Sequence, residues 1–143
     1  MVRTAGRVVH VVVAVVPNPQ GEILLALRPK ETHQGGFWEF PGGKLEPGET
    51  PVQGLARELR EELAIDPLTS EPLTQISHDY GDRAVLLDVY RIEAYRGEPR
   101  GNEGQRICWV APRDLRNYEF PAANREIIDW LSESGCRPRP VRP

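Results

Sequence analysis

The order of apolar and polar residues predicts several strands before the first helix. Residues 8–16 are rich in valine, whose branched side chain favours a strand, and we expect this strand to be buried. A turn rich in proline and glycine at residues 17–21 separates it from a second predicted strand at residues 22–27. We expect these two strands to pair as a hairpin. Further strands are predicted at residues 37–40, 73–78, 84–95 and 106–110.

A helix is predicted after residue 50. Thr50 is a good N-cap, Pro51 suits the first helical position, and Gln53 completes a capping box. Apolar residues spaced three and four apart then form one stripe, which consists of Val52, Leu55, Leu59 and Leu63. A helical turn is expected at residues 112–116, and a second full helix from residue 122 or 123 to 134. Because strands and helices do not alternate strictly, we expect an α+β or α/β fold with a mixed sheet sandwiched between α-helices.

Composition narrows the class of protein. The chain has 143 residues, which suits one domain, and we assign residues 1–135 to it and residues 136–143, where basic residues alternate with proline, to a flexible tail. A formal net charge of −3 argues against binding of long DNA or RNA. The apolar run near the N-terminus is too short to span a bilayer. Two distant cysteines form no disulfide framework, so we expect a cytoplasmic protein.

Four glutamates gather around the first predicted helix. Glu58, Glu61 and Glu62 occupy a sector beside its apolar stripe, and Glu49 precedes it by one short loop. Like charges this close repel each other, and a solvated charged face is the simplest explanation for them. Gly42 and Gly43 just upstream favour a second explanation, because carboxylates beside a glycine turn suit Mg²⁺.

The spacing of these residues resembles the signature of the Nudix family of hydrolases. It runs as Gly43-x5-Glu49-x7-Arg57-Glu58-Leu59-x-Glu61-Glu62-x-Ala64-Ile65, where Ala64 replaces the family's glycine at the end of the helix. The resemblance implies a Nudix fold that hydrolyses a nucleoside diphosphate linked to another group. It implies metal ligands for Mg²⁺, or alternatively Mn²⁺, which are Glu58, Glu61, Glu62 and the carbonyl of Gly42 or Gly43.

The same resemblance gives the other members of the signature supporting roles. Glu49 would support the loop or a further metal ion. Arg57 would hold a glutamate in place, and it could pair with Glu61 four residues later. The alanine at position 64 is expected to affect the helix end rather than the metal site.

Outside the signature, most of the chain resembles the MutT-like branch of the family, the 8-oxo-dGTP diphosphatases. Four stretches carry this resemblance: "LALRP" with Arg28, "WEFPGGK" with Phe40, "GNEGQ" with Glu103, and "FPAAN" with Asn124. It implies that Arg28, Phe40 and Asn124 read an oxidised guanine. Glu103 would be a further metal ligand or the base that activates water.

Two more residues join the expected substrate site, and each assignment has a simpler alternative. Arg83, in the turn before a long strand, would lie near the base, and Lys44 would contact phosphate. Arg28 could instead be a solvated strand end, Phe40 a core residue, and Asn124 a helix cap. We expect a small-molecule nucleotide substrate and a monomer, with a dimer as the alternative.

Other functions remain open at this stage. A Nudix pyrophosphatase for pyrimidine nucleotides, of the CTP or 5-methyl-dCTP type, would share the strand and glycine-turn motifs. A non-catalytic module that senses nucleotides would need a broken acidic cluster or an added DNA-binding domain, and the sequence shows neither. The proton acceptor could be Glu103 or Glu58.

Overall fold

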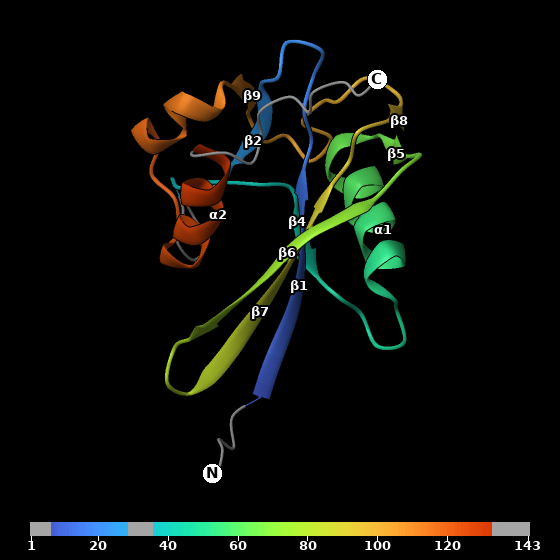
Figure 1. Ribbon diagram of the computed structural model, residues 1–143. Coiled ribbons are helices and arrows are strands. Elements are labelled where there is room, and N and C mark those ends of the chain that lie inside the picture. The colour runs from blue at the N-terminus through green and yellow to red at the C-terminus, as the bar shows by residue number, and fades with distance from the viewer. Residues whose placement is uncertain (1–6, 29–35, 133–143) are drawn as a thin grey trace, which may run out of the picture.

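The computed structural model describes residues 7–28 and 36–132 (Figure 1). The predicted flexible tail and the predicted end of the second helix lie outside these residues. The elements are β1 (Arg7–Val15), β2 (Ile23–Leu27), β3 (Trp38–Glu39), β4 (Gly42–Lys44), α1 (Pro51–Leu63), β5 (Asp66–Pro67), β6 (Glu71–Asp79), β7 (Arg83–Arg91), β8 (Tyr95–Arg96), β9 (Ile107–Val110), the 3₁₀-helices η1 (Pro112–Asn117) and η2 (Ala122–Asn124), and α2 (Arg125–Trp130). Within the described ranges no helix is long and apolar enough to cross a membrane.

The main sheet has the strand order β4-β1-β7-β6. Strands β1 and β7 are parallel along their full lengths, while β4 and β6 pair antiparallel on the outside. A second sheet has the order β3-β2-β9, and β5 pairs with β8 in a third. The main sheet is therefore mixed, as predicted.

Two apolar cores lie on opposite faces of the main sheet, because side chains alternate along β1. Val13 and Val15 belong to the core that includes Ile127 of α2. Val12 and Ala14 belong to the core that includes the buried leucines of α1, which are Leu55, Leu59 and Leu63. Figure 1 shows α1 and α2 on opposite sides of the strands. The predicted sandwich of a sheet between helices is confirmed.

Strand pairing corrects one prediction about β1 and β2. They do not form a hairpin: β2 pairs with β3 and β9 in the second sheet, and only a single bridge joins Pro17 to Ile23. Proline lacks the N–H that a ladder needs, and both edges of β1 are already occupied by β4 and β7. The turn therefore carries the chain from one sheet to another.

Three further predictions need smaller corrections. Val52 does not belong to the buried stripe of α1, because 48% of it is exposed. The strand predicted over residues 84–95 ends at Arg91, and β8 follows separately. The second helix begins as the 3₁₀-turn η2, and its α-helical part starts only at Arg125.

The predicted start of α1 is confirmed in detail. The Thr50 hydroxyl accepts from the backbone N–H of Gln53 at 3.2 Å, and the Gln53 side chain accepts from the Thr50 N–H at 3.0 Å. Two of the N–H groups that a helix start leaves unpaired are thus satisfied, and Pro51 removes a third.

Ala64 ends α1 in the left-handed conformation, with φ 61° and ψ 35°. It is the only non-glycine residue with positive φ in the part of the chain that the structure describes. The Cβ atom of an L-residue costs about 1–2 kcal/mol in this conformation, whereas glycine adopts it freely. The structure thus keeps the backbone that the family's glycine would adopt.

We expect Ala64→Gly to stabilise the protein. Relief of the strain exceeds the entropy that glycine adds to the unfolded chain, so the net gain should be about 1 kcal/mol, or about 3 °C in Tm. Thermal unfolding followed by circular dichroism measures it. As the matched control, Ala56→Gly in the interior of α1 should destabilise by about 1 kcal/mol. Equal losses in both variants would contradict the strain at Ala64.

Candidate active site

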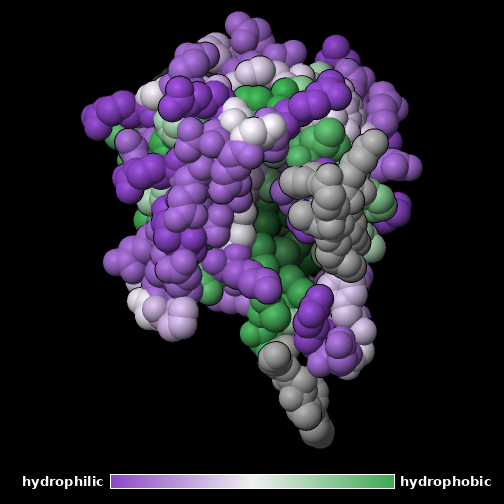
Figure 2. Space-filling view, turned by 180° about the vertical axis from the view of Figure 1, so that it is seen from behind, coloured by the Kyte–Doolittle hydropathy of each residue, from purple (hydrophilic) through white to green (hydrophobic). Residues whose placement is uncertain are grey.

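A cavity of about 610 Å³ lies on the α2 side of the main sheet. Its floor is apolar and consists of strand residues such as Val9, Val11, Val85 and Leu87. Figure 2 shows an apolar hollow with hydrophilic borders on the corresponding side of the molecule. Elements far apart in the sequence supply the polar walls, so this hollow is the natural place to look for the predicted site residues.

Helix α1 and strand β4 form the acidic end of the cavity. Glu58 and Glu62 reach it from α1, and the backbone N–H of Gly42 donates to Glu62 Oε1 at 3.2 Å. Gly43 leaves the room that the Glu58 carboxylate needs, because a Cβ atom there would collide with it. Lys44, on the same strand, also lines the cavity. The glycine turn and the glutamates thus form one wall.

Burial changes the proton affinity of the two glutamates. It raises the pKa of Glu62 to about 9, and the nearby Glu58 adds to the rise against the opposing Gly42 N–H. It also raises the pKa of Glu58, although hydrogen bonds from Glu62 and Arg57 oppose this. Two carboxyl groups in such contact cannot both ionise cheaply unless a cation joins them.

The carboxylates do not all converge on one point. Among residues 7–28 and 36–132, no three acidic, imidazole or thiol side chains form a ready-made metal site. Glu61 is 54% exposed and extends toward Arg57, whose Nη1 lies 3.5 Å from its carboxylate. The pair that faces the cavity is Glu58 and Glu62.

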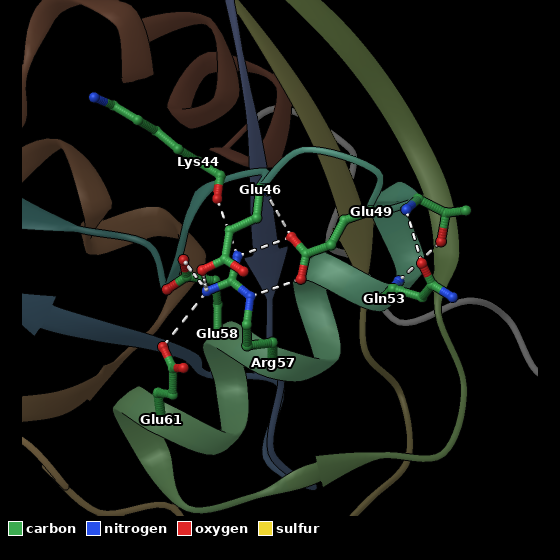
Figure 3. A network of polar contacts seen from close by, with 8 residues as sticks. Lys44, Glu46, Glu49, Gln53, Arg57, Glu58 and Glu61 are labelled. Carbon is green, nitrogen blue, oxygen red and sulfur yellow. Dashed lines mark hydrogen bonds and ion pairs between the residues drawn. The ribbon is translucent and has the colours of Figure 1, made fainter.

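Arg57 is the centre of a second network on the outer side of this pair (Figure 3). Its Nε and Nη2 donate to the two oxygens of Glu49 at 2.6 and 2.9 Å, and its Nη1 donates to Glu58 Oε2 at 3.1 Å. Its Nη2 also donates to the carbonyl of Lys44 at 3.1 Å. The hydrogen bonds from Arg57 lower the pKa of Glu49 to about 2. The guanidinium thus joins β4 and the loop before α1 to the helix.

The predicted base-reading residues Arg28 and Phe40 line the same cavity. Arg28 donates from Nη1 to Glu39 Oε1 at 2.8 Å, so it is not simply a solvated strand end. Phe40 is buried in the core and also lines the cavity, where its ring stacks on Phe120 at 5.3 Å between centroids. The alternatives of core and cavity wall therefore both hold for Phe40.

Asn124 and Arg83 approach the cavity from two other elements. Asn124 stands at the N-cap position of α2 but makes no capping hydrogen bond with its side chain. Arg83 comes from the start of β7, and its guanidinium lies 6.0 Å from the centroid of the Tyr80 ring. Both residues line the cavity. All five predicted substrate residues thus face one space.

Glu103 lies apart from the cavity, as Glu61 does. It stands exposed in the loop between β8 and β9 and does not line the cavity. Its charge acts on Glu39, as that of Glu58 does. The loop therefore brings Glu103 near the acidic end without placing it in the wall.

Sequence reasoning missed Glu39, Tyr80 and Asp82, which also line the cavity. Burial raises the pKa of Glu39, and its hydrogen bond with Arg28 opposes the rise. One signal was available for Glu39: it is a charged residue between two aromatic residues in a predicted strand. Tyr80 and Asp82 lie in a turn, where polar residues are too common to be a signal.

Comparisons with known proteins point the same way. The sequence matches the NUDIX domain family over residues 12–130. It is 36% identical over 122 residues to the "8-oxo-dGTP diphosphatase" of Escherichia coli K12, covering 85% of this chain and 95% of that protein. It is 34% identical over 128 residues to the "CTP pyrophosphohydrolase" of the same organism, covering 89% and 95%.

Solved structures agree with the sequence relatives. A structure from a study of MutT from Aliivibrio salmonicida and Vibrio cholerae superposes with a TM-score of 0.76 at 34% identity, covering 88% of this chain and 97% of the other. The solution structure of the Escherichia coli ORF135 protein gives 0.81 at 32% identity, covering 94% and 96%. The fold seen here is thus shared along nearly the full length of these neighbours.

Proposed function

The chain belongs to the Nudix family of hydrolases, and on this premise we propose that it hydrolyses 8-oxo-dGTP and related purine dNTPs to the monophosphate and pyrophosphate. The observation that carries the proposal is that the acidic pair of α1 lines the same cavity as Arg28, Phe40 and Asn124. A nucleotide has the same two parts, an anionic phosphate chain and a planar base. The family is generally dependent on a divalent metal ion, and we propose Mg²⁺.

The residues at the acidic end fit this ion. Glu58 and Glu62 offer carboxylate oxygens, and Gly42 and Gly43 of β4 line the same wall of the cavity. They would hold Mg²⁺ together with a carbonyl of Gly42 or Gly43. We propose Glu61, the neighbour of Glu62 on α1, and Glu103, whose charge acts on the cavity residue Glu39, as further ligands. Bound there, the ion would neutralise phosphate oxygens and make water more acidic.

The remaining steps belong to side chains of this chain. Lys44, exposed at the end of β4, is placed to contact the phosphates. Glu103 or Glu58 accepts the proton of the attacking water. Arg57 keeps Glu58 oriented through its hydrogen bond at 3.1 Å.

The other end of the cavity suits an oxidised purine. The amide of Asn124 offers a donor and an acceptor together, which matches a base edge that presents both. Arg28 and Arg83 offer planar guanidinium groups that can stack on a base or donate to it. Phe40 forms the apolar floor beside them. Such a site would select the base, while the acidic end performs the chemistry.

A second candidate is a pyrimidine nucleotide such as CTP. It is favoured by the relative named "CTP pyrophosphohydrolase", which is nearly as similar to this chain as the named 8-oxo-dGTP diphosphatase. Both relatives would share the acidic end. The two candidates therefore differ only at the base, and a substrate comparison separates them.

The test is a steady-state comparison of 8-oxo-dGTP, dGTP and CTP with Mg²⁺. We expect 8-oxo-dGTP to have the highest kcat/KM, and Asn124→Ala to lower that value about 10- to 100-fold by removing a bidentate contact worth about 1–3 kcal/mol. Asn117→Ala, at an exposed asparagine of η1 outside the cavity, is the matched control and should change nothing. A preference for CTP that Asn124→Ala leaves intact would contradict the proposal.

The setting of the reaction follows from the substrate. The enzyme acts on the free nucleotide pool of the cytoplasm, where removal of an oxidised dNTP prevents its incorporation during DNA replication and so complements DNA repair. We propose that it acts as a monomer.

A further inference from the structure

The loop between β8 and β9 closes the end of the helix that carries the acidic cluster. A helix leaves its last four carbonyls without intrahelical partners. Here the loop reaches three of them: the Asn102 side chain donates to the Glu61 carbonyl at 3.0 Å, the Asn102 N–H to the Glu62 carbonyl at 2.9 Å, and the Arg100 N–H to the Leu63 carbonyl at 3.1 Å. This part of the loop is thus fixed to the last turn of α1.

Gln105 makes a direct link between the loop and that turn. Its Nε2 donates to the Glu62 carbonyl at 3.0 Å, and its Oε1 accepts from the Glu103 N–H at 2.9 Å. One planar amide therefore connects the backbones of the two glutamates.

The loop is shaped to bring this amide into place. A Cβ atom at Gly101 would collide with the carbonyl of Gln105, so only glycine allows the close approach. Gly104 has φ 85°, which favours glycine, and its N–H donates to the Gly101 carbonyl at 3.0 Å. The tight turn leaves Glu103 at its tip, exposed to solvent.

The charge of Glu103 acts on the candidate active site. Burial is the main reason that the pKa of Glu39 is raised, but the charges of Glu58 and Glu103 add to it. Glu103 is therefore close enough to the acidic end to act on a cavity residue. Gln105 bonds the backbone of Glu103, so it fixes the point from which this exposed side chain extends.

We propose that Gln105 is a positioning residue, which holds Glu103 at a fixed place relative to Glu62 through its two amide hydrogen bonds. The inference rests on the proposed function, in which both glutamates serve the hydrolysis. Gln105 itself contacts neither substrate nor metal ion; it acts through Glu103.

Gln105→Ala should lower kcat about 10-fold and leave KM within about two-fold, since loss of an outer partner typically costs 10- to 100-fold. Gln105→Glu keeps the acceptor but loses the donor, and it should lower kcat similarly. The Glu103 amide should exchange with solvent faster in Gln105→Ala, as measured by hydrogen exchange on the metal-free protein. Gln75→Ala, at an exposed glutamine of β6, is the matched control.

A double-mutant cycle with Glu103→Gln separates positioning from plain stabilisation. If Gln105 acts through Glu103, then Gln105→Ala should cost almost nothing more in kcat once Glu103 is changed. Multiplicative losses would overturn the inference, because they would indicate a general effect on α1. An unchanged kcat in Glu103→Gln would overturn it as well.

The activity of the wild type distinguishes a failure of the proposed function from a failure of this inference. A wild type without Mg²⁺-dependent hydrolysis of any tested nucleotide would overturn the proposed function and this inference together. An active wild type whose kcat is insensitive to Gln105→Ala would overturn the inference alone.

Discussion

Glu62→Gln is expected to lower kcat/KM for the preferred nucleotide by about 10³-fold. The change keeps the shape of the side chain, and its oxygen can still accept from the Gly42 N–H, which now lies 3.2 Å from Glu62 Oε1. What it removes is the negative charge beside Glu58. Metal-assisted stabilisation of phosphate charge is worth several kcal/mol, and about 4 kcal/mol corresponds to this factor. Steady-state kinetics over a range of Mg²⁺ concentrations measures the loss.

The same change should stabilise the metal-free protein at mildly alkaline pH. The pKa of Glu62 lies near 9 in the folded protein, against an ordinary 4.5. The folded state therefore retains a proton that the unfolded state loses, and stability falls as pH rises from about 4.5 through 9. Glutamine does not titrate, so Glu62→Gln avoids this fall. Below pH 4.5 the two proteins should differ little in Tm.

The change in Tm on adding Mg²⁺ is a second test of the role of Glu62. We expect Mg²⁺ to bind the folded protein and to raise the Tm of the wild type, because a ligand that binds only the folded state stabilises it. The rise should shrink in Glu62→Gln. Glu71→Gln, at an exposed position of β6, should retain full activity and the full rise. Turnover of Glu62→Gln within a few-fold of wild type would contradict the assignment of Glu62 as a metal ligand.

Local elements could be predicted from the sequence, whereas strand partners could not. The start of α1 is encoded by Thr50, Pro51 and Gln53, which lie within one turn and determine the cap by themselves. The parallel pairing of β1 with β7 joins residues 7–15 to residues 83–91, and no local signal specifies it. The expected β1–β2 hairpin failed for this reason: adjacency in sequence suggested a pair that the long-range parallel partner excludes.

The acidic end of the site could be predicted because its spacing is helical. Glu58 and Glu62 lie one turn apart on α1, so one sequence pattern places both on the same side. The proposed base-binding residues Arg28, Phe40 and Asn124 come from three distant elements. Only the resemblance to a family suggested that they would meet, since periodicity says nothing about contacts between elements.

Two residues that shape the site gave little or no usable signal. Glu39 becomes important only because β3 and β2 place it 2.8 Å from Arg28. Gln105 hydrogen-bonds to a backbone carbonyl and a backbone N–H. Nearly every residue carries these groups, so the sequence does not indicate which of them a side chain will bind. Such contacts depend on the path of the loop, which is set by the fold as a whole.

Arg57→Met is expected to lower kcat/KM by about 100-fold and to lower Tm at neutral pH. Arg57 uses three nitrogens to bind Glu49, Glu58 and the Lys44 carbonyl, and methionine replaces none of these bonds. Loss of a partner that orients metal ligands typically costs 10- to 100-fold, and Arg57 orients more than one group. Arg57→Lys should recover part of the Tm but little activity, because an ammonium group cannot reproduce the planar fork.

The pH dependence of the Tm difference between wild type and Arg57→Met tests whether the contact with Glu49 is responsible for the loss. Hydrogen bonds from Arg57 hold the pKa of Glu49 at about 2, below its ordinary 4.5. That stabilisation is complete above pH 4.5 and is lost as pH falls toward 2, so the Tm gap between wild type and Arg57→Met should narrow over this window. Arg60→Met, which removes an exposed ion pair with Asp66 on the same helix, should show little change in activity. A gap that stays constant with pH would contradict the role of Glu49.

The position of Arg57 also explains why the helix tolerates so many like charges. The Arg57 side chain, which is 21% exposed, pairs with Glu49 and with one oxygen of Glu58 on the outer side. Glu62 faces the cavity. A second protein cation on the inner side would compete with the metal ion for Glu62. The arrangement therefore stabilises the helix from one side only. Glu62 keeps its proton in the metal-free protein because its pKa lies near 9, and under the proposed function a divalent cation would take the place of that proton.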